Sequence, residues 1–168
     1  AGPVHVRLAK PAAGSFGLQF DGQDDYVTFG VAPVLGGTTF TIETWFNWGG
    51  GGDTASTGGG GVSGYPLVAK GYGESDGNSR DMNYFLGIDE ATGVLAADFE
   101  EGADGNSPGL NHAVFGVTPI TPGVWHHAAL VIRGASRTIW MCSSIVAPPA
   151  NMVGGVWVPL GRPVVPEV

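Results

Sequence analysis

The segment from Phe40 to Trp48 has the clearest alternation of apolar and polar positions in the chain. Its nine residues include two tryptophans, two phenylalanines and an isoleucine, with threonines between them. Aromatic and β-branched residues of this kind favour a pleated, half-buried strand over a helix. Apolar side chains occupy the even-numbered positions, but Thr44 and Trp45 interrupt the alternation. We therefore predict a central strand of a two-layer fold, buried in part on both faces.

Other short apolar runs follow the same period of two and are separated by turns. Asp21–Asp25 and Asp89–Gly93 are predicted turns, because aspartate side chains bond nearby backbone amides and glycine supplies a positive φ. No stretch of ten residues shows a capped helical period. Short strands without helices indicate an antiparallel sandwich or jelly roll. Besides 40–48, the predicted strands are 16–20, 26–29, 66–70, 82–88, 94–100, 124–132 and 138–146.

Four stretches are predicted to lack regular structure. Residues 49–65 contain two runs of four glycines, and we expect a mobile loop because ordering glycine costs the most backbone entropy. Residues 101–122 are expected to be irregular. Residues 1–15 have the composition of a linker, and prolines interrupt every apolar run in 147–168, which we expect to be an irregular C-terminal segment.

Composition and charge exclude several classes of partner. The chain has 168 residues, enough for one domain, and carries a net charge of −8 with seven Lys and Arg. Without a basic cluster, we expect no nucleic-acid partner. Without an apolar run of about 20 residues, we expect no membrane insertion. Cys142 is the one cysteine, so no internal disulfide can form.

Five fragments of the sequence occur in a characteristic order and spacing: LQFDGQDDYV, FTIETWF, LVAK, NYFLG and GVWHHAA. Together they resemble the laminin G-like jelly-roll domains of the concanavalin A-like lectin/glucanase superfamily, to which pentraxins also belong. The resemblance covers residues 16–130. It implies two antiparallel sheets packed face to face, with ligands bound on loops or on the concave face.

The sequence departs from this family after Ala129. The turn that follows Ile132 lacks the family's Asp-Gly residues, and the closing strand of the family is absent. We therefore predict an all-β fold over residues 16–146, an antiparallel two-sheet jelly-roll sandwich that lacks its usual closing strand at the C-terminus. Such a sandwich leaves an unpaired sheet edge, which favours association.

An acidic loop before the predicted strand 82–88 is the first candidate for a metal site. Calcium takes six to eight oxygen ligands, commonly from loops rich in Asp, Asn and Glu. We expect calcium at Glu74, Asp76, Asn78 and Asp81. By resemblance to pentraxins, Asp81 lies where that family places part of its calcium site. The aspartates of the turn Asp21–Asp25 are expected to form the turn, with a structural ion as the alternative.

Binding of carbohydrate requires exposed aromatic rings beside planar polar groups. We expect Tyr72, Asn78 and Arg80 of the acidic loop to contact the ligand, because Tyr72 is the aromatic residue most exposed by its position. Most of the other aromatic candidates are expected in the core, as sandwiches bury large aromatic residues. They are Trp45, Trp48, Tyr84 and Trp140.

Catalytic constellations are incomplete in this sequence. Retaining glucanases of the superfamily that this sequence resembles use two catalytic carboxylates about 5–5.5 Å apart. Asp98 and Glu100 share one strand face, but a third carboxylate is missing, and Glu74-Ser-Asp76 lies in a loop. His126 and His127 point to opposite faces, so they cannot bind one metal together, and we expect one in the core and one on the sheet surface.

From these observations we expect a non-catalytic recognition module, not an enzyme. It would bind a carbohydrate or protein ligand through its loops, with assistance from calcium. The alternatives are a glycoside hydrolase of the glucanase type and a structural spacer without a ligand. The resemblance implies a secreted or cell-surface protein, and the chain is expected to be part of a larger multidomain protein.

Overall fold

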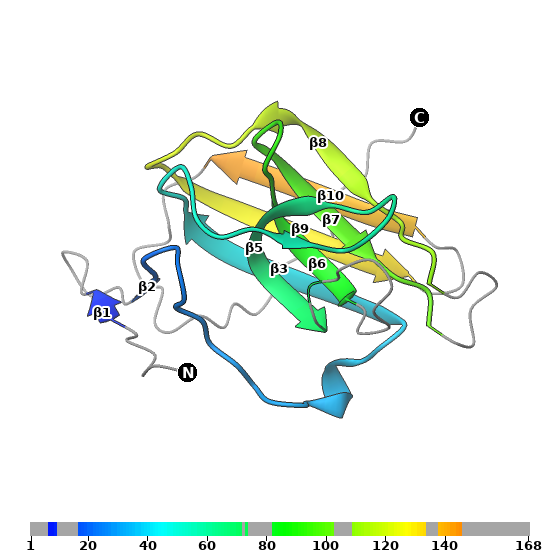
Figure 1. The fold of residues 1–168 in the computed structure, drawn as a ribbon. Helices are drawn as coiled ribbons and strands as arrows, with labels where there is room; N and C mark the ends of the chain where they lie inside the picture. The colour runs from blue at the N-terminus through cyan, green and yellow to red at the C-terminus, as the bar shows by residue number, and fades with distance from the viewer. Residues whose placement is uncertain are drawn as a thin grey trace, which may run out of the picture.

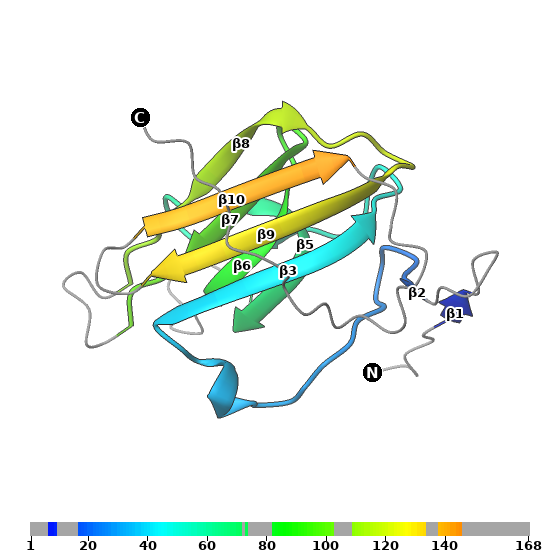
Figure 2. The same ribbon diagram turned by 180° about the vertical axis from the view of Figure 1, so that it is seen from behind.

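Two antiparallel sheets lie face to face, as predicted (Figures 1 and 2). The computed structural model describes residues 7–9, 17–71, 73, 82–102, 109–133 and 138–145, and for 7–9 and 138–145 it describes the backbone alone. The described elements are β-strands and one 3-10 turn, η1 (Pro33–Leu35). The all-β sandwich class expected from the alternating pattern is therefore confirmed.

The larger sheet has five strands in the order β4-β5-β6-β7-β8. Each strand is antiparallel to its neighbour, and β6 and β7 are joined by the predicted tight turn. In that turn, the Asp89 carboxylate accepts hydrogen bonds from both the backbone and the side chain of Thr92, as expected for an aspartate turn. The strands are β4 (Ala55–Ser56), β5 (Ser63–Gly71), β6 (Met82–Asp89), β7 (Val94–Phe99) and β8 (Val114–Pro119).

The smaller sheet has three described strands in the order β10-β9-β3, which Figure 2 shows in front. They are β3 (Thr39–Asn47), β9 (Trp125–Arg133) and β10 (Thr138–Ile145). These three strands match their predicted ranges to within one residue at each end. The expected central position of β3 is wrong for the described chain, because β9 lies in the middle and β3 at the edge.

One apolar core fills the space between the two sheets. The register pairs Ile42 with Leu130 and Phe46 with His126, so these side chains point inward from the smaller sheet. Leu86 and Ile88 of β6 meet them and are fully buried. The alternation recognised in the sequence thus gives each of these strands a face toward the core. The buried members are Phe46, Tyr84, Leu86, Ile88, Leu95, Ala97, Ile120, Ala128, Leu130 and Ile132.

A second apolar cluster lies on the other face of the five-stranded sheet. Residues 49–62, which we call the strap, cross this face (Figure 1). Val62 of the strap is 1% exposed and packs with Phe85 and Ala96. The expectation of a mobile loop over 49–65 is therefore wrong, because Thr57 and Val62 are buried and β4 and the start of β5 lie within that range.

Three further predictions fail at short segments. Residues 26–29 were expected to be a strand, but they pair with no strand in the described chain. Residues 114–119 were expected to be irregular, but they form β8 at the edge of the larger sheet. An edge strand tolerates Pro119 because its outer side needs no ladder hydrogen bond. Arg7–Ala9, inside the expected linker, forms β1 and pairs with β2 (Gly17–Gln19).

Truncation of the core at Leu130 tests the two-sheet arrangement. Leu130 is fully buried in the core, so Leu130→Ala is expected to lower the free energy of unfolding by about 2–5 kcal/mol through lost burial and a residual cavity. Urea denaturation followed by tryptophan fluorescence measures this change. The matched control is Val117→Ala, because Val117 on β8 is 95% exposed and its truncation is expected to cost less than about 0.5 kcal/mol. Equal losses in both variants would contradict the core assignment.

Candidate functional site

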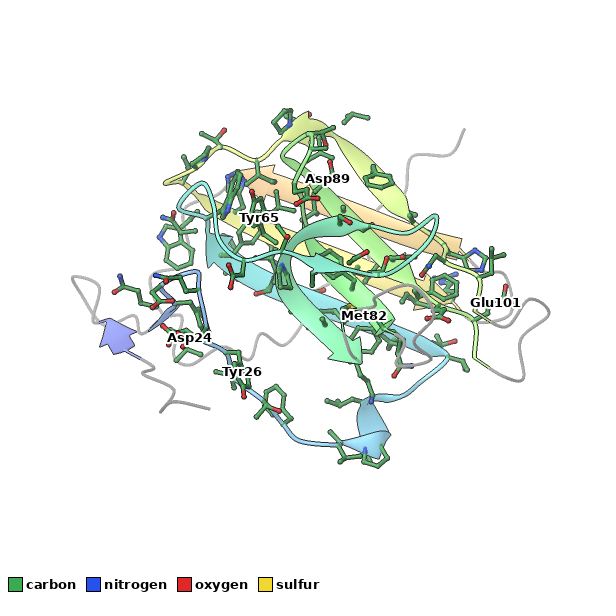
Figure 3. All side chains as sticks on the ribbon, in the orientation of Figure 1. Asp24, Tyr26, Tyr65, Met82, Asp89 and Glu101 are labelled. Atoms are coloured by element: carbon green, nitrogen blue, oxygen red, sulfur yellow. The ribbon has the colours of Figure 1, made fainter. Side chains whose placement is uncertain are left out.

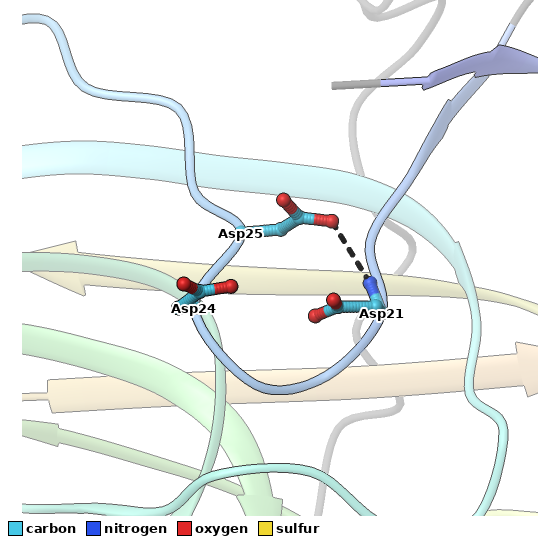
Figure 4. Close-up of side chains that lie close together, drawn as sticks. All are labelled: Asp21, Asp24 and Asp25. Carbon is cyan, nitrogen blue, oxygen red and sulfur yellow. Dashed lines mark hydrogen bonds between the residues drawn. The ribbon is translucent and has the colours of Figure 1, made fainter. Parts of the chain in front are cut away.

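Three aspartates meet in the turn that follows β2. A carboxylate oxygen from each of Asp21, Asp24 and Asp25 lies within 4.8 Å of the others, and Figure 4 shows the three side chains around the turn. Asp21 Oδ1 accepts the backbone N–H of Gln23 at 2.8 Å, and Asp25 Oδ2 accepts that of Asp21 at 3.1 Å. The predicted turn-forming role is therefore confirmed for Asp21 and Asp25. Asp24 makes no such hydrogen bond in the described chain.

The acidic turn is held against the start of the strap. The backbone N–H of Asp53 donates to the carbonyl of Gly22 at 2.8 Å. Gly22 has a φ of 81°, and a Cβ atom built there would lie 3.3 Å from the Cα of Gly52. Glycine at both positions lets the two backbones approach closely. This contact fixes the turn to the sandwich although the aspartates themselves lie at the surface.

A pair of aromatic rings lies beside this contact. Trp48 and Tyr65 have ring centroids 5.5 Å apart at an angle of 39°, and the indole Nε1–H of Trp48 donates to the carbonyl of Gly51 at 2.9 Å. Tyr65 also approaches Gly52, the residue that contacts the acidic turn. Figure 3 shows Tyr65 and Asp24 toward the same end of the sandwich. Carboxylates and half-buried aromatic rings thus share one end of the fold.

The donor set of the acidic turn suits a hard cation. Carboxylates and backbone carbonyls are the oxygen ligands that calcium prefers, and water can complete the coordination. The three aspartates would hold such an ion.

The residues predicted from the sequence to bind calcium or ligand lie outside the described part of the chain. Their roles stay predictions. They are Tyr72, Glu74, Asp76, Asn78, Arg80 and Asp81.

A buried carboxylate, Asp98, holds the strap onto the larger sheet. Its Oδ2 accepts the hydroxyl of Thr57 at 2.5 Å, and its Oδ1 accepts the backbone N–H of His112 at 2.8 Å. The same hydroxyl oxygen of Thr57 accepts the N–H of Val62 at 2.7 Å. Asp98 is 1% exposed, and this burial raises its pKa although the hydrogen bonds oppose the shift.

A stacked ring pair and a glycine of the strap pack around Asp98. His112 stacks on Phe99 with centroids 4.5 Å apart, and its Nε2 lies 2.9 Å from Glu101 Oε1. A Cβ atom at Gly61 would meet the oxygens of Thr57 and Asp98, so the strap fits only with glycine there. Asp98 was recognised from the sequence as one of two carboxylates on a strand, but its role as the anchor of the strap was not.

The two adjacent histidines lie on opposite faces of β9, as predicted. His126 is 3% exposed, stacks on Phe46, and its Nε2–H donates to the carbonyl of Thr121 at 3.0 Å. His127 lies on the outer face, with its ring 5.0 Å from that of Trp45. Its Nε2 approaches Glu43 Oε2 at 3.7 Å. The expectation of one core and one surface histidine is confirmed.

Of the aromatic candidates, Tyr84 belongs to the core. Trp48 packs against the edge of that core, next to Tyr65. Trp45 belongs to the outer face of the smaller sheet, and its indole nitrogen is buried without a hydrogen-bond partner in the described chain. The side chain of Trp140 lies outside the description, although its backbone pairs with Val131.

Comparison with known protein families identifies the class. The model of the concanavalin A-like lectin/glucanases superfamily matches residues 21–141. The chain therefore belongs to this superfamily, as a laminin G-like domain with a lectin-type fold. Searches of curated proteins and of solved structures found no match. Among the described residues, no helix is long and apolar enough to cross a membrane.

Removal of the Asp98 carboxylate tests its role as an anchor. Asp98→Ala leaves the hydroxyl of Thr57 buried without its acceptor, so we expect the free energy of unfolding to fall by about 1–3 kcal/mol. The N–H of His112 loses one of two acceptors and keeps the carbonyl of Phe99 at 3.0 Å. Asp98→Asn keeps an acceptor for the N–H of His112 and can donate to Thr57. Its free energy of unfolding should therefore fall less than that of Asp98→Ala. Urea denaturation at neutral pH measures both. A loss in Asp98→Ala no greater than in Asp98→Asn would contradict the anchor.

The pH dependence of stability gives a separate test of the same carboxylate. Its pKa is raised in the folded state, so the folded state binds the proton more tightly than the unfolded state does. Protonated Asp98 therefore contributes to the free energy of unfolding. This contribution is complete below about pH 4, the pKa of the carboxyl in the unfolded chain, and is lost as the pH rises through the higher pKa of the folded state. Stability measured across this window should fall less in Asp98→Asn than in the wild type. Parallel profiles would contradict the assignment.

Proposed function

We propose that this domain is a non-catalytic recognition module that binds a carbohydrate or protein ligand through its loops with the help of calcium. The observation that carries the proposal is the constellation at one end of the sandwich, where Asp21, Asp24 and Asp25 lie beside the Trp48–Tyr65 pair. The carboxylates would hold calcium, and a bound ion can offer open coordination positions to ligand oxygens. Neighbouring aromatic rings would stack on an apolar face of the ligand.

The environment of Asp98 favours recognition over hydrolysis. A glycosidase needs two carboxylates that face a substrate about 5–5.5 Å apart or farther. Asp98 is 1% exposed and both of its oxygens accept protein hydrogen bonds beneath the strap. A carboxylate enclosed in this way cannot reach a glycosidic bond unless the strap leaves the sheet. The proposal therefore assigns Asp98 to the scaffold and the ligand to the loops.

The acidic turn is a second candidate calcium site, in addition to the one predicted from the sequence in the loop that contains Glu74 and Asp81. A secreted or cell-surface position within a larger multidomain protein is part of the proposal, because extracellular modules meet calcium at high concentration and can use sites of modest affinity. A spacer without any ligand is the competing possibility that the experiments separate.

Terbium luminescence tests the acidic turn directly. Terbium replaces calcium at oxygen sites, and the neighbouring Tyr26 can sensitise its emission. Asp24→Asn removes a carboxylate that makes no hydrogen bond in the described turn, so the turn is expected to keep its shape. We expect saturable emission that calcium displaces in the wild type, with affinity about tenfold weaker or more in Asp24→Asn.

The control is Glu90→Gln, which removes the same charge from an exposed position in the β6–β7 turn. It should titrate like the wild type. Equal titrations for all three proteins would contradict calcium binding at the acidic turn. A glycan array with and without chelator then tests recognition: a signal lost on chelation supports the proposal, and no signal in either condition, together with no saturable emission, leaves the spacer.

A further inference from the structure

The segment between the acidic turn and β3 exposes an unusual amount of apolar surface. Phe29 is 79% exposed, Val31 84% and Val34 92%, and these side chains follow one another within six residues. Scattered apolar residues are normal on a protein surface, but a contiguous set marks an interaction site. The large apolar residues exposed in this segment are Tyr26, Val27, Phe29, Val31, Val34 and Leu35.

The backbone of the same segment has the sequence of a strand but no strand partner. Residues 26–31, Tyr-Val-Thr-Phe-Gly-Val, are rich in the β-branched and aromatic types that strands prefer. In the described chain, residues 25–29 belong to no ladder, and the one local bond is from the N–H of Gly30 to Thr28 Oγ1. Among the described residues, this segment therefore combines strand propensity with backbone donors that no described strand accepts.

An acceptor edge is present in the same chain. β3 pairs with β9 along one side, and no described strand pairs with its other side. Natural proteins protect such edges with charges, prolines or bulges. No charged residue occurs from Tyr26 to Ile42, and Glu43 at the middle of β3 is the one acid on that strand. The edge from Phe40 to Phe46 is therefore a template for an added strand.

The connection between the two elements contains a strained position. Ala32 has a φ of 35°, in the left-handed region that favours glycine, and Pro33 follows it at the start of η1. Hinges that hold strain promote the exchange of a segment between identical chains, because the strain is released when the hinge opens.

We propose that residues 26–31 of one copy pair, in a second copy, with the side of Phe40–Phe46 in β3 that no described strand covers, so that two chains exchange strands. A second copy is the partner because each chain carries both the donor segment and the acceptor edge, and a two-fold axis forms both ladders at once. Tyr26, Phe29 and Val31 would supply on the order of several hundred Å² per copy, a sizeable part of the roughly 800 Å² per partner that a stable interface buries. This inference is independent of the proposed ligand binding.

Sedimentation velocity over a wide range of protein concentration tests the exchange. We expect a reversible monomer–dimer equilibrium in the wild type, and a dissociation constant at least about tenfold higher in Phe29→Asp and in Val31→Asp. The control is Val117→Asp, since Val117 is at least as exposed but lies on β8 of the other sheet. It should dimerise like the wild type. Because all three side chains are exposed, thermal unfolding is expected to show folded variants.

Hydrogen exchange identifies the contact itself. Backbone amides of residues 26–31 are expected to become protected at concentrations where the dimer forms and to exchange freely in Val31→Asp. A wild type that is monomeric throughout would overturn the proposal. So would a dimer in which these amides remain unprotected, or one that Val117→Asp weakens as much as Val31→Asp does.

Discussion

The burial of one apolar face from each sheet is the interaction on which the rest of this domain depends. Ile42 and Leu130 of the smaller sheet meet Leu86 and Ile88 of the larger sheet across the core. Because side chains alternate along a strand, burial of one face fixes the register of every strand and sends the intervening residues outward. The positions of His126 inside and His127 outside are direct consequences of this single constraint.

On the outer face of the larger sheet, a buried hydrogen bond positions the chain more than apolar packing does. Apolar contact from Val62 covers part of it, but the strap is located by the hydrogen bond from Thr57 to the buried Asp98, whose other oxygen accepts the N–H of His112. A buried carboxylate is costly unless its oxygens are satisfied, so the strap must close for Asp98 to be tolerated. The glycines that suggested mobility instead permit close contact, since Gly61 has no space for a side chain.

Two surfaces lie outside both the apolar core and the contact between the strap and Asp98. The acidic turn with its three aspartates remains at one end, pinned through Gly22 but accessible. The side of β3 that no described strand pairs with and the apolar segment that precedes it form a second region, at the border of the smaller sheet. The proposed recognition of a ligand and the proposed association between chains would thus use separate parts of the same sandwich.

The sequence by itself determined the class of fold, strand β3, the strands from β5 to β10 except β8, and the opposite faces of the two histidines, because period two is a local property of the chain. It did not determine where a strand lies in a sheet, whether 26–29 finds a partner, or that Thr57 reaches Asp98 across 41 positions. Those outcomes depend on contacts between distant segments. Only the tertiary structure decides them, since the free energy of a strand edge or a buried carboxylate depends on the groups that fold against it.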